Sequence, residues 1–473
     1  MKFITYDKLN EYLEILTNSK SKNKVIKRKD LATSPCGFPI THYTIGNGPK
    51  HITVMAGTHG TEIIGIDFIL KLMKVISEGH GVYKNFDSNK FTLDFIPCQN
   101  PEGFIIVTES LKPYVNNLTE NEFEKLSKEY YLNYCKDDKV YIEINKLLSS
   151  LSDEKQRSNI IKKFWDENRL KDITHNLILN FCQDNLKPTT NLSDKIDELF
   201  KNFYELKIID DLNDKVISKN KFHHQMFPDI NYQNLPEKDE RYILLKNKVK
   251  TIMETKYGNY SFNSAALVDW RANSNGVDLN KNNPNNFKIK NEEKRKNKFK
   301  PLFGNLRFVN LMREVPGPQG KVSISDDKFT FEKENIGLLK HLLNLKKEEK
   351  YVGALSYHGT GGVIYSRPKD YRSVKDKQKS EALKTIDTYN DEFAKAYQKI
   401  TEYNIMPYPK ELTGTGDMIR QMLPGFLIIE LSKMGGNPLG PYGDKNNYKQ
   451  VINDNIIAFN EILETITNKI SVK

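Results

Sequence analysis

Cysteine is scarce in this chain. Its 473 residues include four cysteines, and no two of them form a Cys-x-x-Cys pair: Cys36, Cys98, Cys135 and Cys182. A framework of disulfides needs more cysteines at closer spacings than these, and it belongs to oxidising compartments. We therefore expect a protein of a reducing compartment whose fold depends on an ordinary hydrophobic core.

Long apolar runs are also missing. The longest, such as Phe104–Val107 and Phe426–Ile429, are far shorter than the roughly 20 residues that span a bilayer. The first ten residues, Met1–Asn10, become polar and charged at once, so they contain no apolar segment of the kind found in signal peptides. These absences predict a cytoplasmic protein with no membrane partner.

Acidic residues are outnumbered by basic ones, 61 to 72, which gives a net charge of +11. Such an excess can indicate nucleic-acid binding. Here the lysines are spread along the chain, and the basic run Lys288–Lys300 contains Glu292 and Glu293 and no interleaved aromatic cluster. We assign the excess to solvated faces and expect no nucleic-acid partner.

Glycine nearly vanishes between about Glu109 and Tyr257, where charged amphipathic segments with helical periodicity follow one another. A chain of this length favours a core domain with an insertion or a second domain. We predict an all-helical insertion over residues 110–257, acting as a lid or packing module. It would divide an α/β catalytic domain into residues 1–109 and 258–473.

The rest of the chain shows alternating strand and helix patterns. Gly46-Asn-Gly48 predicts a hairpin turn between strands at Ile40–Ile45 and His51–Ala56. Further strands are expected at 91–97, 354–357 and 426–431, and helices after Thr5, at Asp376–Tyr403 and at Asn446–Thr467.

One stretch, Met55-Ala-Gly-Thr-His-Gly-Thr-Glu62, reads as a strand that runs through a glycine turn into a helix. His59 and Glu62 are three residues apart, which would place both side chains on one face of a first helical turn. An imidazole and a carboxylate so placed can bind one metal ion, but a catalytic zinc needs a third protein ligand.

His358 is a candidate for that third ligand. It follows the apolar strand 354–357 and precedes Gly359, and the carboxyl ends of strands are where open α/β sheets place their ligands. Glu430 is equally notable, because an ionised carboxylate within the apolar run Phe426–Leu431 is costly unless it faces a polar site. Near a metal-activated water, Glu430 would serve as a general base and acid.

These stretches together resemble the zinc metallocarboxypeptidases of the carboxypeptidase A type (peptidase family M14). The resemblance rests on five stretches in the family's order: Thr58-His-Gly-Thr-Glu62, Asn100-Pro-Glu-Gly103, Arg271–Asn282, Ser356-Tyr-His358 and Ile429-Glu-Leu431. It covers somewhat more than half of the chain and resembles bacterial members. It implies a three-layer α/β/α fold with a mixed, mostly eight-stranded sheet, to which the helical insertion is added.

The resemblance also implies roles for single residues. One zinc ion per chain would be held by His59, Glu62 and His358, with Asp278 orienting His59. Glu430 and Arg271 would be catalytic, Arg271 by stabilising the developing oxyanion. The substrate, a peptide or an N-acyl amino acid, would contact Arg271 and the further residues Asn280, Lys281 and Tyr408.

Two departures bear on the substrate. Lys281 stands where the family's peptidases carry an arginine, and lysine keeps the charge but lacks the fork that binds a carboxylate through two parallel hydrogen bonds. The position that selects the substrate side chain falls near Gly416, which carries no charge.

The leading hypothesis is therefore a zinc-dependent, carboxypeptidase-like hydrolase that cleaves an amide bond near a substrate carboxylate. An alternative is a deacylase of N-acyl amino acids, since aspartoacylase and succinylglutamate desuccinylase relatives share an opening similar to Gly57–Glu62. A second alternative is a metal-free relative that binds a partner through its insertion. The sequence leaves the oligomeric state open.

Overall fold

A computed structural model describes residues 3–151, 156, 159–160, 163–164, 174–187, 190–205, 226–257, 263–295, 321–325, 327–410 and 412–471. Its centre is an eight-stranded mixed sheet in the order β1-β4-β6-β5-β7-β10-β8-β9. The strands are β1 (Val25–Lys27), β4 (Tyr43–Ile45), β6 (Phe91–Ile96), β5 (Lys50–Ala56), β7 (Tyr351–His358), β10 (Phe426–Glu430), β8 (Val363–Tyr365) and β9 (Asn404–Ile405). The neighbours β6, β5, β7 and β10 are parallel, whereas β4 and β8 join them antiparallel.

The predicted hairpin between 40–45 and 51–56 is wrong. The strand β4 pairs with β6, and β6 pairs with β5, so β6 lies between the two segments. The Gly46–Gly48 turn instead crosses the start of β6, where the Gly48 N–H donates to the Phe91 carbonyl at 3.2 Å. A Cβ on Gly48 would lie 2.1 Å from the Lys90 carbonyl carbon, so the close crossing needs glycine.

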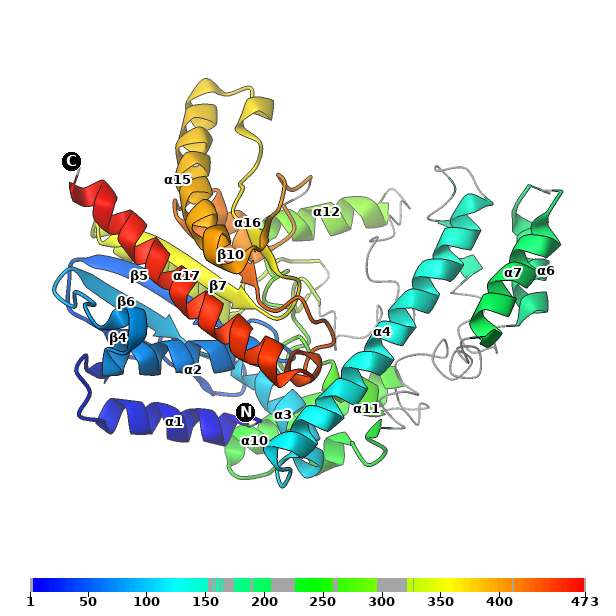
Figure 1. The fold of residues 1–473 in the computed structure, drawn as a ribbon, viewed down its shortest axis with the longest axis horizontal. Helices are drawn as coiled ribbons and strands as arrows, with labels where there is room; N and C mark the ends of the chain where they lie inside the picture. The colour runs from blue at the N-terminus through cyan, green and yellow to red at the C-terminus, as the bar shows by residue number, and fades with distance from the viewer. Residues whose placement is uncertain are drawn as a thin grey trace.

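Helices cover both faces of the sheet (Figure 1). One face packs against α1 (Tyr6–Asn18), α2 (Ile63–Glu78), α3 (Pro101–Val115), α15 (Lys377–Thr401) and α17 (Lys445–Ser471). The other face buries Met55, Ile96 and Ala354 beneath α14 (Lys333–Lys347) and α16 (Thr415–Arg420). The predicted three-layer α/β/α architecture is confirmed. The expected helices at both ends of the chain form too, and Thr5 caps α1 by accepting from the Lys8 N–H.

The described part of 110–257 contains helices and one short 3₁₀ turn, and no strand. The helices α6 (His175–Asn185) and α7 (Leu192–Glu205) lie at the far end of α4 (Glu120–Ser150), away from the sheet (Figure 1). There they share a separate apolar cluster with the end of α4. By contrast, Phe123 and Tyr130 of α4 and most of the buried side chains of α10 (Glu240–Tyr257) join the main core. The division of the chain at 110 and 257 therefore stays a prediction, because the two parts share one core.

In the part of the chain that the structure covers, no helix combines the length and the apolar character that crossing a membrane requires.

Candidate metal centre

Three of the parallel strands end at one edge of the sheet, and each leads to a candidate side chain. His358 is the last residue of β7, Glu430 is the last residue of β10, and β5 ends just before the turn that carries His59. Glu430 and His358 are register partners on adjacent strands, so their side chains leave the sheet on the same face. The carboxyl edge thus gathers residues that are hundreds of positions apart in the sequence.

The turn that carries His59 and Glu62 precedes the helix instead of forming its first turn. Glu62 is the N-terminal capping residue of α2, and its N–H donates to the His59 carbonyl at 3.2 Å. A Cβ on Gly60 would lie 2.2 Å from the Gly103 backbone, so only glycine allows the turn to rest against α3. The expectation of a shared helical face is therefore corrected: a tight turn brings the two side chains together.

The side chains of His59, Glu62 and His358 converge. The His59 Nδ1 atom lies 2.7 Å from Glu62 Oε1, and the His358 Nδ1 atom lies 3.0 Å from Glu62 Oε2. All three residues are buried. Burial alone would raise the pKa of the Glu62 carboxyl, but the two imidazoles outweigh it and hold that pKa well below its usual range.

The far nitrogens of both imidazoles have partners of their own. The His59 Nε2 atom lies 3.2 Å from Asp278 Oδ1, and the His358 Nε2 atom lies 3.2 Å from Ser356 Oγ. Burial raises the pKa of Asp278, but the charges of His59 and Lys281 and the hydrogen bond from His59 lower it further than burial raises it. With Nε2 protonated against these partners, each Nδ1 lone pair is free to bind a metal ion, the arrangement typical of metal-bound histidines.

Arg271 supplies a further sign that a cation belongs in this cluster. Its Nη2 atom lies 3.0 Å from His59 Nδ1, the same atom that contacts Glu62 Oε1. One imidazole nitrogen cannot accept from a guanidinium and donate to a carboxylate at once. A metal ion bound by His59 Nδ1 and Glu62 removes this conflict, because both atoms then act as electron-pair donors. The three residues therefore fit a divalent metal.

Glu430 stands beside this cluster. Within the described chain its carboxylate has no hydrogen-bond donor, although it is mostly buried. Burial raises the pKa of Glu430 to about 7; His358 opposes that rise, and the nearby Glu62 carboxylate adds to it. A carboxylate with this pKa can exchange protons near neutral pH.

The two predicted anchors of a substrate carboxylate differ in their surroundings. Asn280 lines a cavity together with His358. Lys281 is absent from that lining, and its Nζ atom lies 3.4 Å from Asp278 Oδ2. Lys281 is therefore held at the side of the site by the same carboxylate that contacts His59.

Tyr408 lies in a different set of contacts. Its hydroxyl donates to Asp387 of α15 at 2.5 Å, and the guanidinium groups of Arg367 and Arg372 lie 5.4 and 5.5 Å from its ring centroid. No contact in the described structure joins it to His59, Glu62 or His358.

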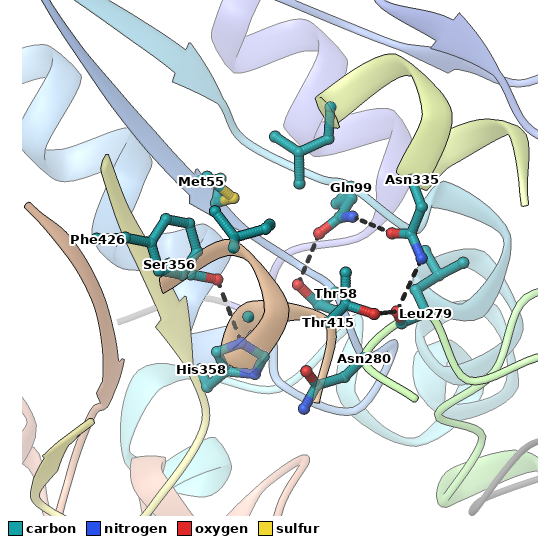
Figure 2. A pocket seen from close by; sticks show the side chains of 13 residues that line it. Met55, Thr58, Gln99, Leu279, Asn280, Asn335, Ser356, His358, Thr415 and Phe426 are labelled. Atoms are coloured by element: carbon teal, nitrogen blue, oxygen red, sulfur yellow. Dashed lines mark hydrogen bonds between the residues drawn. The ribbon is translucent and has the colours of Figure 1, made fainter. Parts of the chain in front are cut away.

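The cavity beside His358 is shown in Figure 2. Apolar side chains from Met55, Leu279, Leu338, Ile419 and Phe426 line it, together with uncharged polar groups. Among these, the Gln99 amide donates to Asn335 and accepts from the Thr58 hydroxyl. Gly416 also lines the cavity, and a Cβ there would lie 2.4 Å from Ile428. Among the residues that the structure describes, the lining carries no carboxylate, lysine or arginine.

Sequence reasoning missed several supporting residues. Ser356 belongs to the Ser356-Tyr-His358 motif, but the motif does not predict its contact with His358. The Asn100 amide donates to the carbonyls of Thr58 and Arg271 and so joins two site loops. The turn signal at Asn100-Pro-Glu-Gly103 indicated a loop, but its partners lie up to 171 positions away, beyond any local pattern.

No protein-family model matches the chain, and no curated protein matches it. Among solved structures, bovine thrombin-activatable fibrinolysis inhibitor in complex with tick carboxypeptidase inhibitor is 11% identical over 99% of this chain and 98% of its own, with a TM-score of 0.43. Carboxypeptidase A from Helicoverpa armigera is 11% identical over 97% and 73% of the two chains, with a TM-score of 0.40. Murein-tripeptide amidase MpaA from Escherichia coli O157 is 11% identical over 91% of each chain, with a TM-score of 0.33. Likeness at this level concerns the fold, and with such TM-scores it carries no argument about activity.

Proposed function

We propose that this protein is a zinc-dependent, carboxypeptidase-like hydrolase that cleaves an amide bond near a substrate carboxylate. The observation that carries the proposal is the convergence of His59 Nδ1 and His358 Nδ1 on the two oxygens of Glu62. Two imidazoles and one carboxylate are a donor set typical of catalytic zinc sites, which leave one position open. One zinc ion per chain would be held there.

When bound, zinc acts as a Lewis acid: it lowers the pKa of a water molecule and polarises a carbonyl group. Glu430 would accept the proton of the attacking water and pass it to the nitrogen of the leaving amine. The proton count then balances, because the water contributes a hydroxyl to the acyl product and a proton to the amine. The pKa of Glu430, which burial raises to about 7, suits this exchange.

Arg271 would stabilise the negative charge that develops on the carbonyl oxygen. Its side chain is partly exposed beside His59, and its Nε atom is buried without a hydrogen-bond partner. A guanidinium group with unused donors can therefore turn toward a substrate without breaking a complete network.

Asn280 and Lys281 would contact the substrate carboxylate. Lys281 already lies beside Asp278, so its charge is partly compensated and a carboxylate would be held less firmly than by an arginine fork. The uncharged lining of the cavity favours a neutral side chain on the substrate. Tyr408 would contact the substrate only after the segment that carries it moved from Asp387 toward the site.

The test combines metal analysis with a cleavage screen. We expect about one zinc ion at the His59 site and hydrolysis that chelation removes and added zinc restores. Glu430→Gln should lower kcat roughly 100- to 10,000-fold while zinc stays bound. Glu461→Gln, at a partly exposed position of α17 where Glu461 pairs with Lys399, is the matched control and should retain activity. Full activity of Glu430→Gln would overturn the mechanism.

The substrate panel separates the alternatives. Dipeptides with neutral carboxy-terminal residues test peptidase activity, whereas N-acetylated and N-succinylated amino acids test the deacylase alternative. The absence of zinc from the purified protein, with no uptake on titration, would favour the metal-free binding protein instead.

A further inference from the structure

A second group of metal-ligating side chains lies apart from the proposed catalytic residues. The ligand atoms of His42, Asp94 and His341 all lie within 4.8 Å of one another, as do those of His59, Glu62 and His358. His51 adjoins this second group, with Nδ1 2.7 Å from Asp94 Oδ2. Seven of the nine histidines have no role in the proposed reaction. Three of those seven, His42, His51 and His341, gather here around the carboxylate of Asp94.

The four residues come from separate elements of the sheet and its covering helix. His42 precedes β4, His51 is near the start of β5, Asp94 is in β6, and His341 is in α14. His59 lies beyond the other end of β5, and the strand from His51 to Ala56 alone spans roughly 16 Å. The second group is therefore a distinct site on the α14 face of the sheet.

The surroundings make this group unusual. Leu338 and Leu342 of α14 face the sheet in an apolar cluster, and His341 lies between them in the same helix surface. The Asp94 side chain is 2% exposed, and those of His42 and His341 are 11% and 10% exposed. Polar groups that are this buried need a hydrogen-bond or metal partner.

Hydrogen bonds supply some of these partners, since His341 Nε2 lies 3.3 Å from the Thr53 hydroxyl, but they do not join His341 to Asp94. His42 Nε2 lies 2.9 Å from Asp94 Oδ1, whereas His341 Nε2 lies 4.0 Å from the same oxygen, too far for a hydrogen bond. Two ligands on a tetrahedral zinc ion are about 3.3 Å apart, given bonds of about 2.0–2.1 Å. The observed 2.9 and 4.0 Å bracket that separation, so a small shift of His341 completes the site.

We propose that His42, Asp94 and His341 bind a second divalent transition-metal ion, for which zinc suits the two imidazoles and one carboxylate. His51 donates to Asp94 Oδ2 and orients the carboxylate, so it is a positioning residue. The ion ties α14 to strands β4 and β6. Its function is structural, because it fixes α14 on the sheet. The same helix contributes Leu338 to the lining of the cavity beside His358.

The experiment counts zinc bound to metal-free protein titrated with Zn²⁺. We expect two equivalents in the wild type and one in a variant that lacks the first site, H59A/H358A. Adding His341→Asn to that variant should abolish the remaining equivalent, and His42→Asn should do the same. His51→Gln should retain the ion with roughly 10- to 100-fold weaker affinity.

His80→Asn is the matched control, because His80 is an exposed histidine that pairs with Glu78, and it should leave both equivalents in place. Cobalt substitution of H59A/H358A gives a readout that needs no activity: visible absorption bands should appear at one equivalent and be lost with His341→Asn. If H59A/H358A binds no zinc while circular dichroism shows it folded, the second site is refuted. If the wild type binds one equivalent that H59A/H358A keeps and His341→Asn removes, the second site is supported. The site at His59, and with it the proposed function, is then refuted.

Discussion

At the residue scale, the candidate metal centre depends on side chains that orient other side chains. His59 and His358 each present Nδ1 to Glu62 because their Nε2 atoms contact Asp278 and Ser356. A carboxylate partner raises the basicity of its histidine more than a hydroxyl does, so Asp278 should matter more than Ser356.

Asp278→Asn tests this orienting role. The amide has nearly the same shape and can still accept from the Asn280 N–H, a contact of 2.9 Å in the wild type. We expect zinc affinity to fall about 10- to 100-fold, as measured by competition with a coloured chelator. Asp370→Asn, which alters a surface pair with Arg372, should leave the affinity unchanged. Equal affinities in the two variants would contradict the orienting role.

Glu334 gives a prediction about pH. Burial raises the pKa of this carboxyl from 4.5 to about 8, and the nearby Glu102 adds to the rise. The folded state therefore keeps a proton that the unfolded state loses above about pH 4.5. Stability should fall as the pH rises from about 4.5 to 8, by up to about 1.4 kcal/mol per pH unit from this group.

Glu334→Gln should remove that slope, because glutamine stays neutral and its oxygen can still accept from Asn273. Urea unfolding at pH 5 and pH 8 measures the effect: the variant should gain stability relative to the wild type at pH 8. Glu348→Gln, at an exposed position, is the control. An unchanged pH slope in Glu334→Gln would show that Glu334 is not protonated in the folded protein.

At the element scale, the site depends on how closely the His59 turn approaches α3. The backbones of Gly60 and Gly103 touch, and a Cβ on Gly103 would in turn lie 2.7 Å from the Ala272 carbonyl oxygen. These contacts bring the turn, the start of α3 and the Arg271 loop together. Such backbone packing leaves no room for a side chain.

Gly60→Ala should displace the turn, since its new Cβ would meet backbone 2.2 Å away. We expect a loss of about 1–3 kcal/mol in stability together with weaker zinc binding. Gly81→Ala is the comparison: its Cβ meets nothing within 4 Å, although its φ of 55° still makes alanine costly. Zinc affinity should fall in Gly60→Ala and stay unchanged in Gly81→Ala. If Gly60→Ala binds zinc as tightly as the wild type, the packing argument is wrong.

At the scale of the whole molecule, the chain has a main core and an outer apolar cluster formed by the end of α4 with α6 and α7. The near end of α4 belongs to the main core, and its Tyr130 hydroxyl donates to the Asn437 carbonyl at 3.1 Å. Asn437 lies next to Gly359, which follows the proposed ligand His358. The helical segment is therefore joined to the site through one end of α4.

Ile178→Ala tests whether the outer cluster unfolds independently. Ile178 of α6 is fully buried, and its truncation should cost about 2–5 kcal/mol. We expect hydrogen exchange to accelerate in α6 and α7 but not in α2 or β5, because local openings follow cooperative units. Leu72→Ala, in the main core, should accelerate exchange throughout. If hydrogen exchange in β5 is also faster in Ile178→Ala, the outer cluster and the main core unfold as one cooperative unit.

The sequence by itself determined the features that depend on neighbouring residues. Sequence patterns located α1, α15 and α17, and Thr5 predicted the cap of α1. The isolated carboxylate of Glu430 in an apolar strand predicted a polar site at that strand. The spacing of His59 and Glu62 also predicted that their side chains lie together. In the structure a turn brings them together, not a shared face of a helix. Each of these follows from local geometry, which a few residues specify.

Only the tertiary structure decided what depends on strand order and packing. It inserted β6 between β4 and β5, where the backbone of β6 has a pairing strand on each side. It held Tyr408 against α15 and Lys281 against Asp278. It also brought His42, Asp94 and His341 together from three elements, and no local pattern could reveal that cluster, since its members meet only when α14 packs on the sheet.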